Sequence, residues 1–263
     1  MGIHNSDVFI PRHCSGRQAA NGAFQKYAVV PSIAVSELPY SIPTSVGVVL
    51  PLGMSTAAAG LYQKGFLALP LPSEKPETLD RTVLIWGGSS SVGSCCIQLA
   101  VASGVEVITT ASPRNFDYCK RLGAKQCFDY HDRGVEDQIV EALKGKTVAG
   151  AYHAVGADGA VQACARIVDR TKGKAIVVTV RGVPDTGIPS SVRAKSSRCS
   201  QSPVPEAMTL TSRVKSLRLK SSRTTWDRTF GGNSCPQRWK RVPLCRNRIL
   251  WSWVRSYGQC SSG

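Results

Sequence analysis

A Gly/Ser-rich turn is the part of this sequence whose residue types and spacing best suit ligand chemistry. Four apolar residues, Val83 to Trp86, run into the segment GGSSSVG at 87–93. This turn fits the spacing G-x-G-x-x-G with Ser in place of the middle glycine. Glycines let the backbone approach a diphosphate, and the N–H groups that open the following helix face the anion. The turn therefore predicts a dinucleotide-binding loop. The loop residues expected to hold the diphosphate are Gly88, Ser90, Ser91, Val92 and Gly93.

The second candidate segment follows the next predicted strand and reads TTASPR over residues 109–114. A carboxylate at this place accepts the ribose hydroxyls of NAD, whereas donors and positive charge suit the 2′-phosphate of NADP. The segment holds hydroxyl groups and a cation but no carboxylate, which favours NADPH over NADH. The alternative is that Arg114 is a solvated residue at a helix start. The residues assigned to this end of the cofactor are Thr110, Ser112, Arg114 and Tyr130.

These residues need a scaffold that brings several strand ends to one edge. Predicted strands begin near residues 83, 105, 126, 149 and 174, and predicted helices cover 92–102, 115–122, 135–143 and 159–168. A strand and a returning helix repeated at this interval are typical of a doubly wound parallel sheet. The fold class is therefore α/β, of the Rossmann type. After Val180 the alternation stops, so no sixth strand is expected.

Composition divides the 263 residues into three parts. Residues 1–80 contain a predicted strand at 24–30 and a predicted helix at 54–62, and residues 81–180 form the Rossmann domain. Residues 181–263 hold 16 Lys/Arg against three acidic residues, so most of the net charge of +16 lies there. This tail is also poor in large aliphatic residues, which predicts low order. Its interleaved Trp and Lys/Arg offer nucleic-acid binding as a lesser alternative, but no recognised module frames them.

Cysteine spacing and hydropathy limit the remaining classes of function. The ten cysteines form no C-x-x-C pair, so we expect reduced cysteines and no metal site. No apolar run is long enough for a membrane span, and the first residues lack the hydrophobic region of a signal peptide. The expected location is the cytoplasm. His131 and His153 stand in no recognisable arrangement with a nucleophile, so the catalytic residue stays unknown.

Several motifs in fixed order resemble the medium-chain dehydrogenase/reductase superfamily. They are GAFQKYAVVP, LPLGMSTAAAGLYQKGF, WGGSSSVGSCCIQLA, EVITTASPRNFDYCKRLGA, QCFDYHD and AGAYHAVG. The resemblance covers about Gly22 to Lys195. It is greatest for the zinc-free quinone-oxidoreductase and trans-enoyl-reductase branch, and within it for fungal zinc-binding alcohol dehydrogenase domain-containing proteins of the concanamycin-induced type.

The resemblance implies an oxidoreductase that binds NAD(P)H between a GroES-like catalytic lobe and the Rossmann lobe. Such enzymes pass hydride to an enoyl, quinone or other conjugated carbonyl substrate, a small molecule. It implies that Thr56 and Val155 lie at the nicotinamide end, and that residues 1–80 are a remnant of the catalytic lobe.

Both ends of the chain depart from the family pattern. Most of the lobe expected before Gly22 is absent, and from about residue 196 the sequence has the composition of an out-of-frame translation. A non-catalytic cofactor-binding fragment is therefore the alternative to an active reductase.

Overall fold

The computed structural model describes residues 7–9, 26, 35–37, 47–49, 51–73, 75–156 and 159–197. The chain divides into two compact units, and the larger spans Leu52–Ala207. In the other unit, β1 (Asp7–Phe9) and β2 (Val35–Glu37) pair as an antiparallel ladder. The strand predicted at 24–30 and the sequence after residue 197, including the suspected out-of-frame part and the nucleic-acid alternative, lie outside the described residues.

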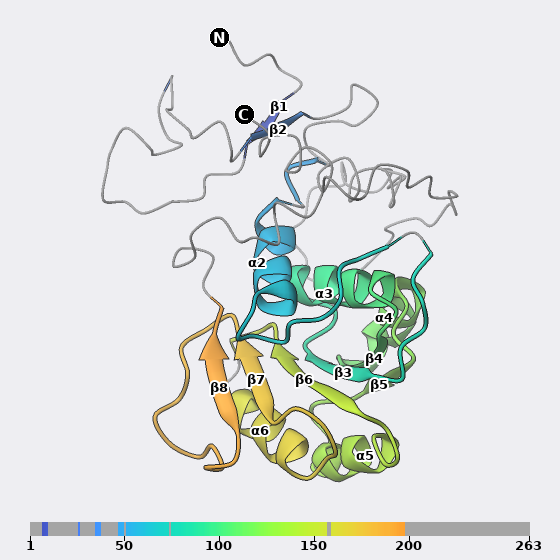
Figure 1. The fold of residues 1–263 in the computed structure, drawn as a ribbon, viewed down its shortest axis with the longest axis vertical. Coiled ribbons are helices and arrows are strands. Elements are labelled where there is room, and N and C mark those ends of the chain that lie inside the picture. Colours follow the sequence, from blue (N-terminus) through green and yellow to red (C-terminus); the bar gives the residue numbers. More distant parts are fainter. Residues whose placement is uncertain are drawn as a thin grey trace. The chain divides into compact units, whose positions relative to one another are not determined.

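The larger unit is built on one parallel sheet of six strands in the order β5-β4-β3-β6-β7-β8 (Figure 1). The strands are β3 (Thr82–Trp86), β4 (Glu106–Thr110), β5 (Gln126–Phe128), β6 (Val148–His153), β7 (Ile176–Thr179) and β8 (Arg193–Ser196). From β3 the chain builds outward through β4 and β5, then returns to add β6, β7 and β8 on the other side. This is a doubly wound sheet, so the predicted α/β Rossmann class is confirmed.

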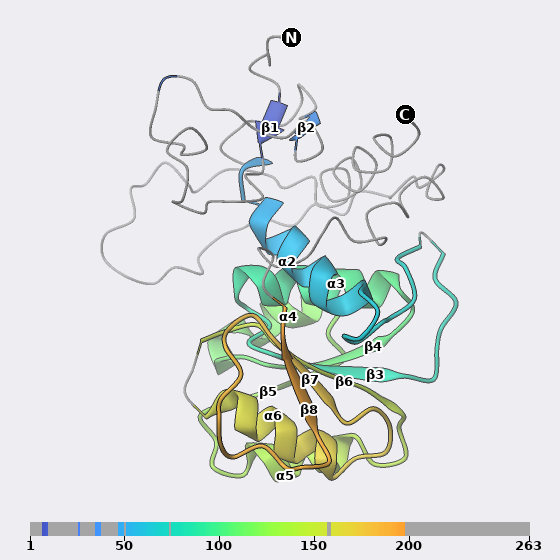
Figure 2. The ribbon, with the colours of Figure 1, turned by 60° about the vertical axis from the view of Figure 1, so that its left-hand side comes forward.

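Helices cover both faces of this sheet (Figure 2). They are α2 (Pro51–Tyr62), α3 (Ser91–Ala102), α4 (Phe116–Leu122), α5 (Val135–Ala142) and α6 (Ala160–Asp169), with a short 3-10 turn η3 at Pro113–Asn115. Helices α3 and α4 lie on one side and α5 and α6 on the other. The helix predicted at 54–62 is α2, which begins three residues earlier, at Pro51.

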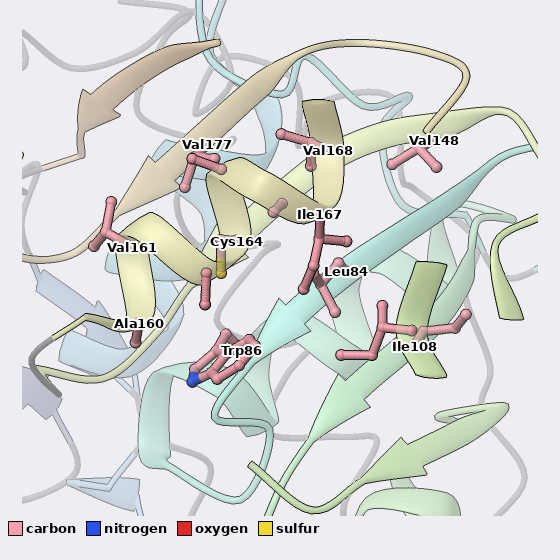
Figure 3. Packing of buried hydrophobic residues seen from close by; sticks show 14 of the residues in the cluster. Leu84, Trp86, Ile108, Val148, Ala160, Val161, Cys164, Ile167, Val168 and Val177 are labelled. Atoms are coloured by element: carbon pink, nitrogen blue, oxygen red, sulfur yellow. The ribbon is translucent and has the colours of Figure 1, made fainter. Parts of the chain in front are cut away.

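Alternation along β3 supplies both layers of the core. Leu84 and Trp86 pack among α6 residues such as Cys164 and Ile167 (Figure 3). Because successive side chains of a strand point to opposite faces, the equally buried Val83 and Ile85 face the side covered by α3. Burying each such side chain contributes about 1.5 to 3 kcal/mol. The buried β3 strand therefore holds its carboxyl end, where the Gly/Ser turn begins, in a fixed place.

The sixth strand corrects the expectation that the alternation ends at Val180. Strand β8 pairs in parallel with β7, and its ladder is extended at both ends by the bonds Arg193 N–H to Ala175 O at 2.9 Å and Ser197 N–H to Thr179 O at 2.8 Å. Its sequence RAKS has no apolar run because it is an edge strand whose side chains are mostly half-buried. Residues 181–197 thus include part of the sheet.

Candidate cofactor-binding site

The Gly/Ser turn joins β3 to α3 at the carboxyl edge of the sheet. Gly93, in the first turn of α3, lies so close to the turn that a Cβ there would be 2.2 Å from the carbonyl oxygen of Gly87. Gly87 has φ +86 and packs against Val155, whose Cγ1 would be 2.5 Å from a Cβ at position 87. Position 93 requires glycine because of this close contact. Position 87 requires glycine because of its contact with Val155 and because of its positive φ. The turn is therefore compact and backbone-lined.

Ser90 closes the turn onto the start of α3. Its hydroxyl donates to the carbonyl oxygen of Gly87 at 2.8 Å and accepts from the N–H of Gly93 at 3.0 Å. It is the N-cap of α3. The Ser90 hydroxyl, predicted to contact a diphosphate, is thus engaged within the loop. A direct contact of Ser90 with the cofactor stays a prediction.

Replacing Ser90 by Ala is expected to lower the free energy of unfolding by about 1 kcal/mol, because an N-cap and its bond to the turn are lost together. Urea unfolding followed by circular dichroism measures this change. Ser91→Ala is the matched control, since Ser91 is exposed and should change stability by less than about 0.5 kcal/mol. Equal losses in the two variants would contradict the capping role.

The remaining amides of the turn are available to a ligand. Gly93 N–H is bound by Ser90 Oγ, and Ser94 N–H by the Ser90 carbonyl at 2.8 Å. The N–H groups of Ser91 and Val92 have no recorded acceptor in the described part of the chain. Both residues are at least partly accessible, and α3 contributes the positive end of its dipole there. This arrangement suits a diphosphate.

Thr110, at the end of β4, holds the turn from the neighbouring strand. Its hydroxyl accepts from Gly87 N–H at 3.1 Å, and its carbonyl accepts from Gly88 N–H at 2.9 Å. Its side chain is fully buried. Thr110 therefore positions the loop through these two hydrogen bonds. Its direct contact with the cofactor stays a prediction.

Two of the residues assigned to the 2′-phosphate meet beside the end of β4, one after β4 and one after β5. The hydroxyls of Ser112 and Tyr130 are 3.0 Å apart although 18 residues separate them in sequence. Arg114 is exposed in η3, two residues from Ser112. Tyr130 is also exposed and stacks at a tilt on the ring of His131, with the ring centroids 4.1 Å apart. The two hydroxyls thus lie side by side, and Arg114 is close to Ser112 in the chain.

Asn115 is a site residue that the sequence argument missed. It is buried, and its Nδ2 donates to Ser89 Oγ at 3.4 Å, linking η3 to the Gly/Ser turn. Its Oδ1 is buried and has no partner among the described residues. A buried acceptor without a donor is costly, which favours a ligand or water here. The only sequence signal is an Asn directly after Arg114, at the first position of the predicted helix 115–122.

The carboxyl end of β6 meets the turn from the other side. Ala154 N–H donates to the Trp86 carbonyl at 3.0 Å, and Val155 follows against Gly87. Since β3 and β6 are the adjacent strands from which the chain winds in opposite directions, this is the place where ligands of such sheets bind. Thr56 lies in α2, buried, and its carbonyl accepts from the β6 hydroxyl of Tyr152 at 2.8 Å.

His153 ends β6 as a buried, neutral side chain. Its Nδ1 shares a hydrogen bond with Thr179 Oγ1 at 2.9 Å, and its Nε2 has no partner in the described residues. Burial, reinforced by the charge of Arg181, lowers the pKa of His153 from 6.5 to about 4. A neutral imidazole hydrogen-bonded to the buried Thr179 hydroxyl fits a packing role.

The described residues do not provide a metal site. No group of three His, Cys, Asp or Glu side chains lies close enough there to hold an ion. Burial raises the pKa of Cys95 to about 12, so its thiol stays protonated despite its place near the start of α3. The predicted absence of a metal in the whole chain stays a prediction.

Among the described residues, no helix has the length and apolar character that a membrane span needs.

The six parallel strands, the Gly/Ser turn and the helix that follows it define a Rossmann-type domain of the kind found in dehydrogenases. Residues 91–207 match the family described as zinc-binding dehydrogenase. The chain therefore carries a zinc-binding dehydrogenase domain, and the resemblance predicted from the motifs is confirmed. The match continues past Lys195, where the motif-based resemblance ends. Despite the family's description, the residues described here do not fit a zinc ion.

Curated fungal relatives agree with this assignment. The chain is 42% identical over 186 residues to a dehydrogenase, orf1, of Aspergillus niger, covering 69% of this chain and 54% of the relative. It is 42% identical over 187 residues to the trans-enoyl reductase himH of Aspergillus japonicus, covering 69% and 52%. A zinc-binding alcohol dehydrogenase domain-containing protein, cipB, of Emericella nidulans is 41% identical over 166 residues, covering 63% and 44%. The chain spans about half the length of the curated relatives it matches.

Solved structures show the same fold. An alcohol dehydrogenase superfamily protein from Novosphingobium aromaticivorans aligns with a TM-score of 0.51 at 25% identity, covering 64% of this chain and 48% of that one. The CurK enoyl reductase aligns with a TM-score of 0.52 at 20% identity over the same shares. The described sheet and its helices thus have the architecture of known oxidoreductases.

Proposed function

We propose that this chain binds NADPH at the carboxyl edge of its sheet and serves hydride transfer to a conjugated carbonyl substrate. The observation that carries the proposal is the turn after β3, where glycines exclude side chains while the Ser91 and Val92 N–H groups have no recorded acceptor in the described part of the chain. These groups would hold the diphosphate by backbone hydrogen bonds and the dipole of α3.

The other end of the nucleotide is supported by the residues after β4. Ser112 and Tyr130 would offer hydroxyl donors to a 2′-phosphate, and Arg114 would offer a planar cationic donor. The end of β4 carries Thr110 and Ala111, without the carboxylate that would accept the ribose hydroxyls of NAD. The unpartnered Oδ1 of Asn115, between this segment and the turn, is a further acceptor within reach of the site.

The reaction is proposed from the relatives named above, of which one is a dehydrogenase and one a trans-enoyl reductase. The cofactor would supply a hydride to the electrophilic carbon of an enoyl, quinone or similar substrate. Val155, which follows the carboxyl end of β6 and packs against Gly87, would form an apolar wall for the nicotinamide. Thr56, on α2, would lie at the same end of the cofactor. A hydroxyl or water would supply the proton, and the residue that holds it is not assigned.

Arg114→Ala is expected to raise the dissociation constant of NADPH about tenfold, because a hydrogen bond to a charged group contributes about 1.5 kcal/mol or more. The dissociation constant of NADH should not change. Fluorescence titration of both nucleotides measures the two constants. Arg121→Ala removes the same charge from an exposed site at the end of α4 and should affect neither nucleotide. Tighter binding of NADH than NADPH by the unmodified chain would overturn the cofactor choice.

Turnover is tested separately by following NADPH absorbance with an enone substrate. Oxidation that depends on both the chain and the enone supports the reductase. Tight NADPH binding without oxidation supports the alternative of a non-catalytic cofactor-binding fragment. Absence of binding to either nucleotide by the folded chain would reject the cofactor site itself.

A further inference from the structure

Tyr130 is an exposed side chain that two contacts nevertheless hold in place. It lies in the loop 129–134, which joins β5 to α5. Its hydroxyl is 3.0 Å from Ser112 Oγ, and its ring lies against the imidazole of His131 with 4.1 Å between the centroids and 35° between the planes. An exposed side chain without such contacts changes rotamer freely. The position of the Tyr130 hydroxyl therefore depends on the residues at its two ends.

The His131 imidazole is itself held by Asp129. Its Nδ1 lies 2.9 Å from Asp129 Oδ1, and the same oxygen accepts from the backbone N–H of His131 at 3.0 Å. Because the partner of Nδ1 is a carboxylate, which only accepts, Nδ1 carries its hydrogen. Asp132 N–H closes the turn by donating to the Asp129 carbonyl at 3.1 Å. Asp129 thus orients the ring that packs on Tyr130.

The loop is anchored at both of its ends. Ala111 N–H donates to the Phe128 carbonyl at 3.0 Å, which joins the end of β5 to the segment that follows β4. At the other end, the Asp132 carboxylate accepts from Gly134 N–H at 2.8 Å and from Nε2 of Gln138, on α5, at 2.7 Å. The loop is therefore fixed beside the segment that carries Ser112.

The two hydroxyls that meet here leave one hydrogen for a ligand. Ser112 and Tyr130 share one hydrogen bond, in which either oxygen can be the donor. The hydrogen of the other hydroxyl has no recorded acceptor in the described part of the chain. A phosphate oxygen is a suitable acceptor for it. This donor is in place only while the Tyr130 ring stays in its present position.

We propose that His131 is a positioning residue for cofactor selectivity, a role that rests on the proposed NADPH site. Held by Asp129, its ring keeps the Tyr130 phenol beside Ser112 and so forms the hydroxyl pair before the 2′-phosphate arrives. Because the exposed tyrosine is already ordered in the free protein, binding loses less conformational entropy. NADH has no 2′-phosphate, so its binding does not depend on this arrangement. His131 acts through Tyr130 and needs no contact with the cofactor.

Replacing His131 by Ala tests this role in the full chain. The dissociation constant of NADPH should rise about fivefold and that of NADH should change less than about twofold, as fluorescence titration measures. Arg133→Ala is the matched control, because Arg133 is exposed in the same loop and has no recorded partner among the described residues. It should change either constant by less than about twofold. Equal rises for NADPH in the two variants would overturn the positioning role, and circular dichroism verifies that both variants fold.

Tyr130→Phe separates positioning from a direct effect of His131. Losing the hydroxyl should raise the dissociation constant of NADPH about tenfold, and adding His131→Ala should then raise it by no more than about twofold. A full further rise in the double variant would show that His131 acts without Tyr130, which contradicts the proposal. His131→Phe keeps a ring against Tyr130 and should bind NADPH more tightly than His131→Ala. Equal constants for these two variants would also contradict it.

Nucleotide binding by the unmodified chain separates this role from the proposed function. A folded chain that binds neither nucleotide rejects the cofactor site, and the selectivity role with it. Preferential binding of NADPH that His131→Ala leaves unchanged keeps the proposed function and rejects only the role of His131. A loss confined to NADPH in His131→Ala, absent when Tyr130 lacks its hydroxyl, is the result we expect.

Discussion

Gly93→Ala is expected to lower the free energy of unfolding by about 3 kcal/mol, although alanine is the better helix former. The added Cβ would lie 2.2 Å from the carbonyl oxygen of Gly87 and 2.9 Å from the Cα of Gly88. Both are backbone atoms that cannot rotate away, so α3 must move off the end of β3. Urea unfolding measures the loss.

The same displacement should weaken the proposed cofactor site. The N–H groups of Ser91 and Val92 would move with α3, so the dissociation constant of NADPH is expected to rise at least about tenfold. Gly134→Ala is the matched control, because Gly134 has φ −92 and the nearest atom to its added Cβ is 3.5 Å away. It should change stability by less than about 1 kcal/mol. A Gly93→Ala chain as stable as the Gly134→Ala chain would contradict the close packing.

The larger unit is expected to lose about 3 kcal/mol of stability between pH 6.5 and pH 4 through His153 alone. Its side chain is 1% exposed, and burial lowers its pKa to about 4. In the unfolded chain His153 therefore binds a proton near pH 6.5, whereas in the folded chain it binds one only near pH 4. The stabilisation is fully present above pH 6.5 and is lost as the pH falls through this window. Urea unfolding at several pH values measures the slope.

His153→Asn tests this assignment. Asparagine can retain a bond to Thr179 Oγ1 in place of Nδ1, but it does not titrate, so the acid loss in this window should largely disappear. The hydrogen-bonded Asp129 and Asp132 have lowered pKa values and act below this range. His131→Asn removes an exposed imidazole and should leave the acid loss in place. An unchanged slope in the His153→Asn chain would show that another group is responsible.

Local patterns were sufficient to predict most of the larger unit. The strands β3, β4, β6 and β7 are short, mostly buried and largely apolar, and each helix from α3 to α6 has buried residues along one side. Such periodicity belongs to single elements, so it is readable without the partners. The order of alternating elements then restricts the topology to a doubly wound sheet. The Gly/Ser turn was likewise readable, because its residue types and spacing lie within one short segment, and the close contact of Gly93 with Gly87 is local.

Only the tertiary structure could show β8, because strand pairing with β7 makes RAKS a strand and nothing in its own hydrophobicity does so. The same holds for the roles of Ser90, Thr110 and Asn115, whose partners come from the turn or from neighbouring strands. The sequence by itself determined the elements from β3 to β7, the position of the Gly/Ser turn and the resemblance to the family, since those depend on short-range pattern. The structure decided which polar groups form hydrogen bonds within the loop and which are left to bind a ligand. The reason is that packing across the sheet determines the hydrogen-bond partners.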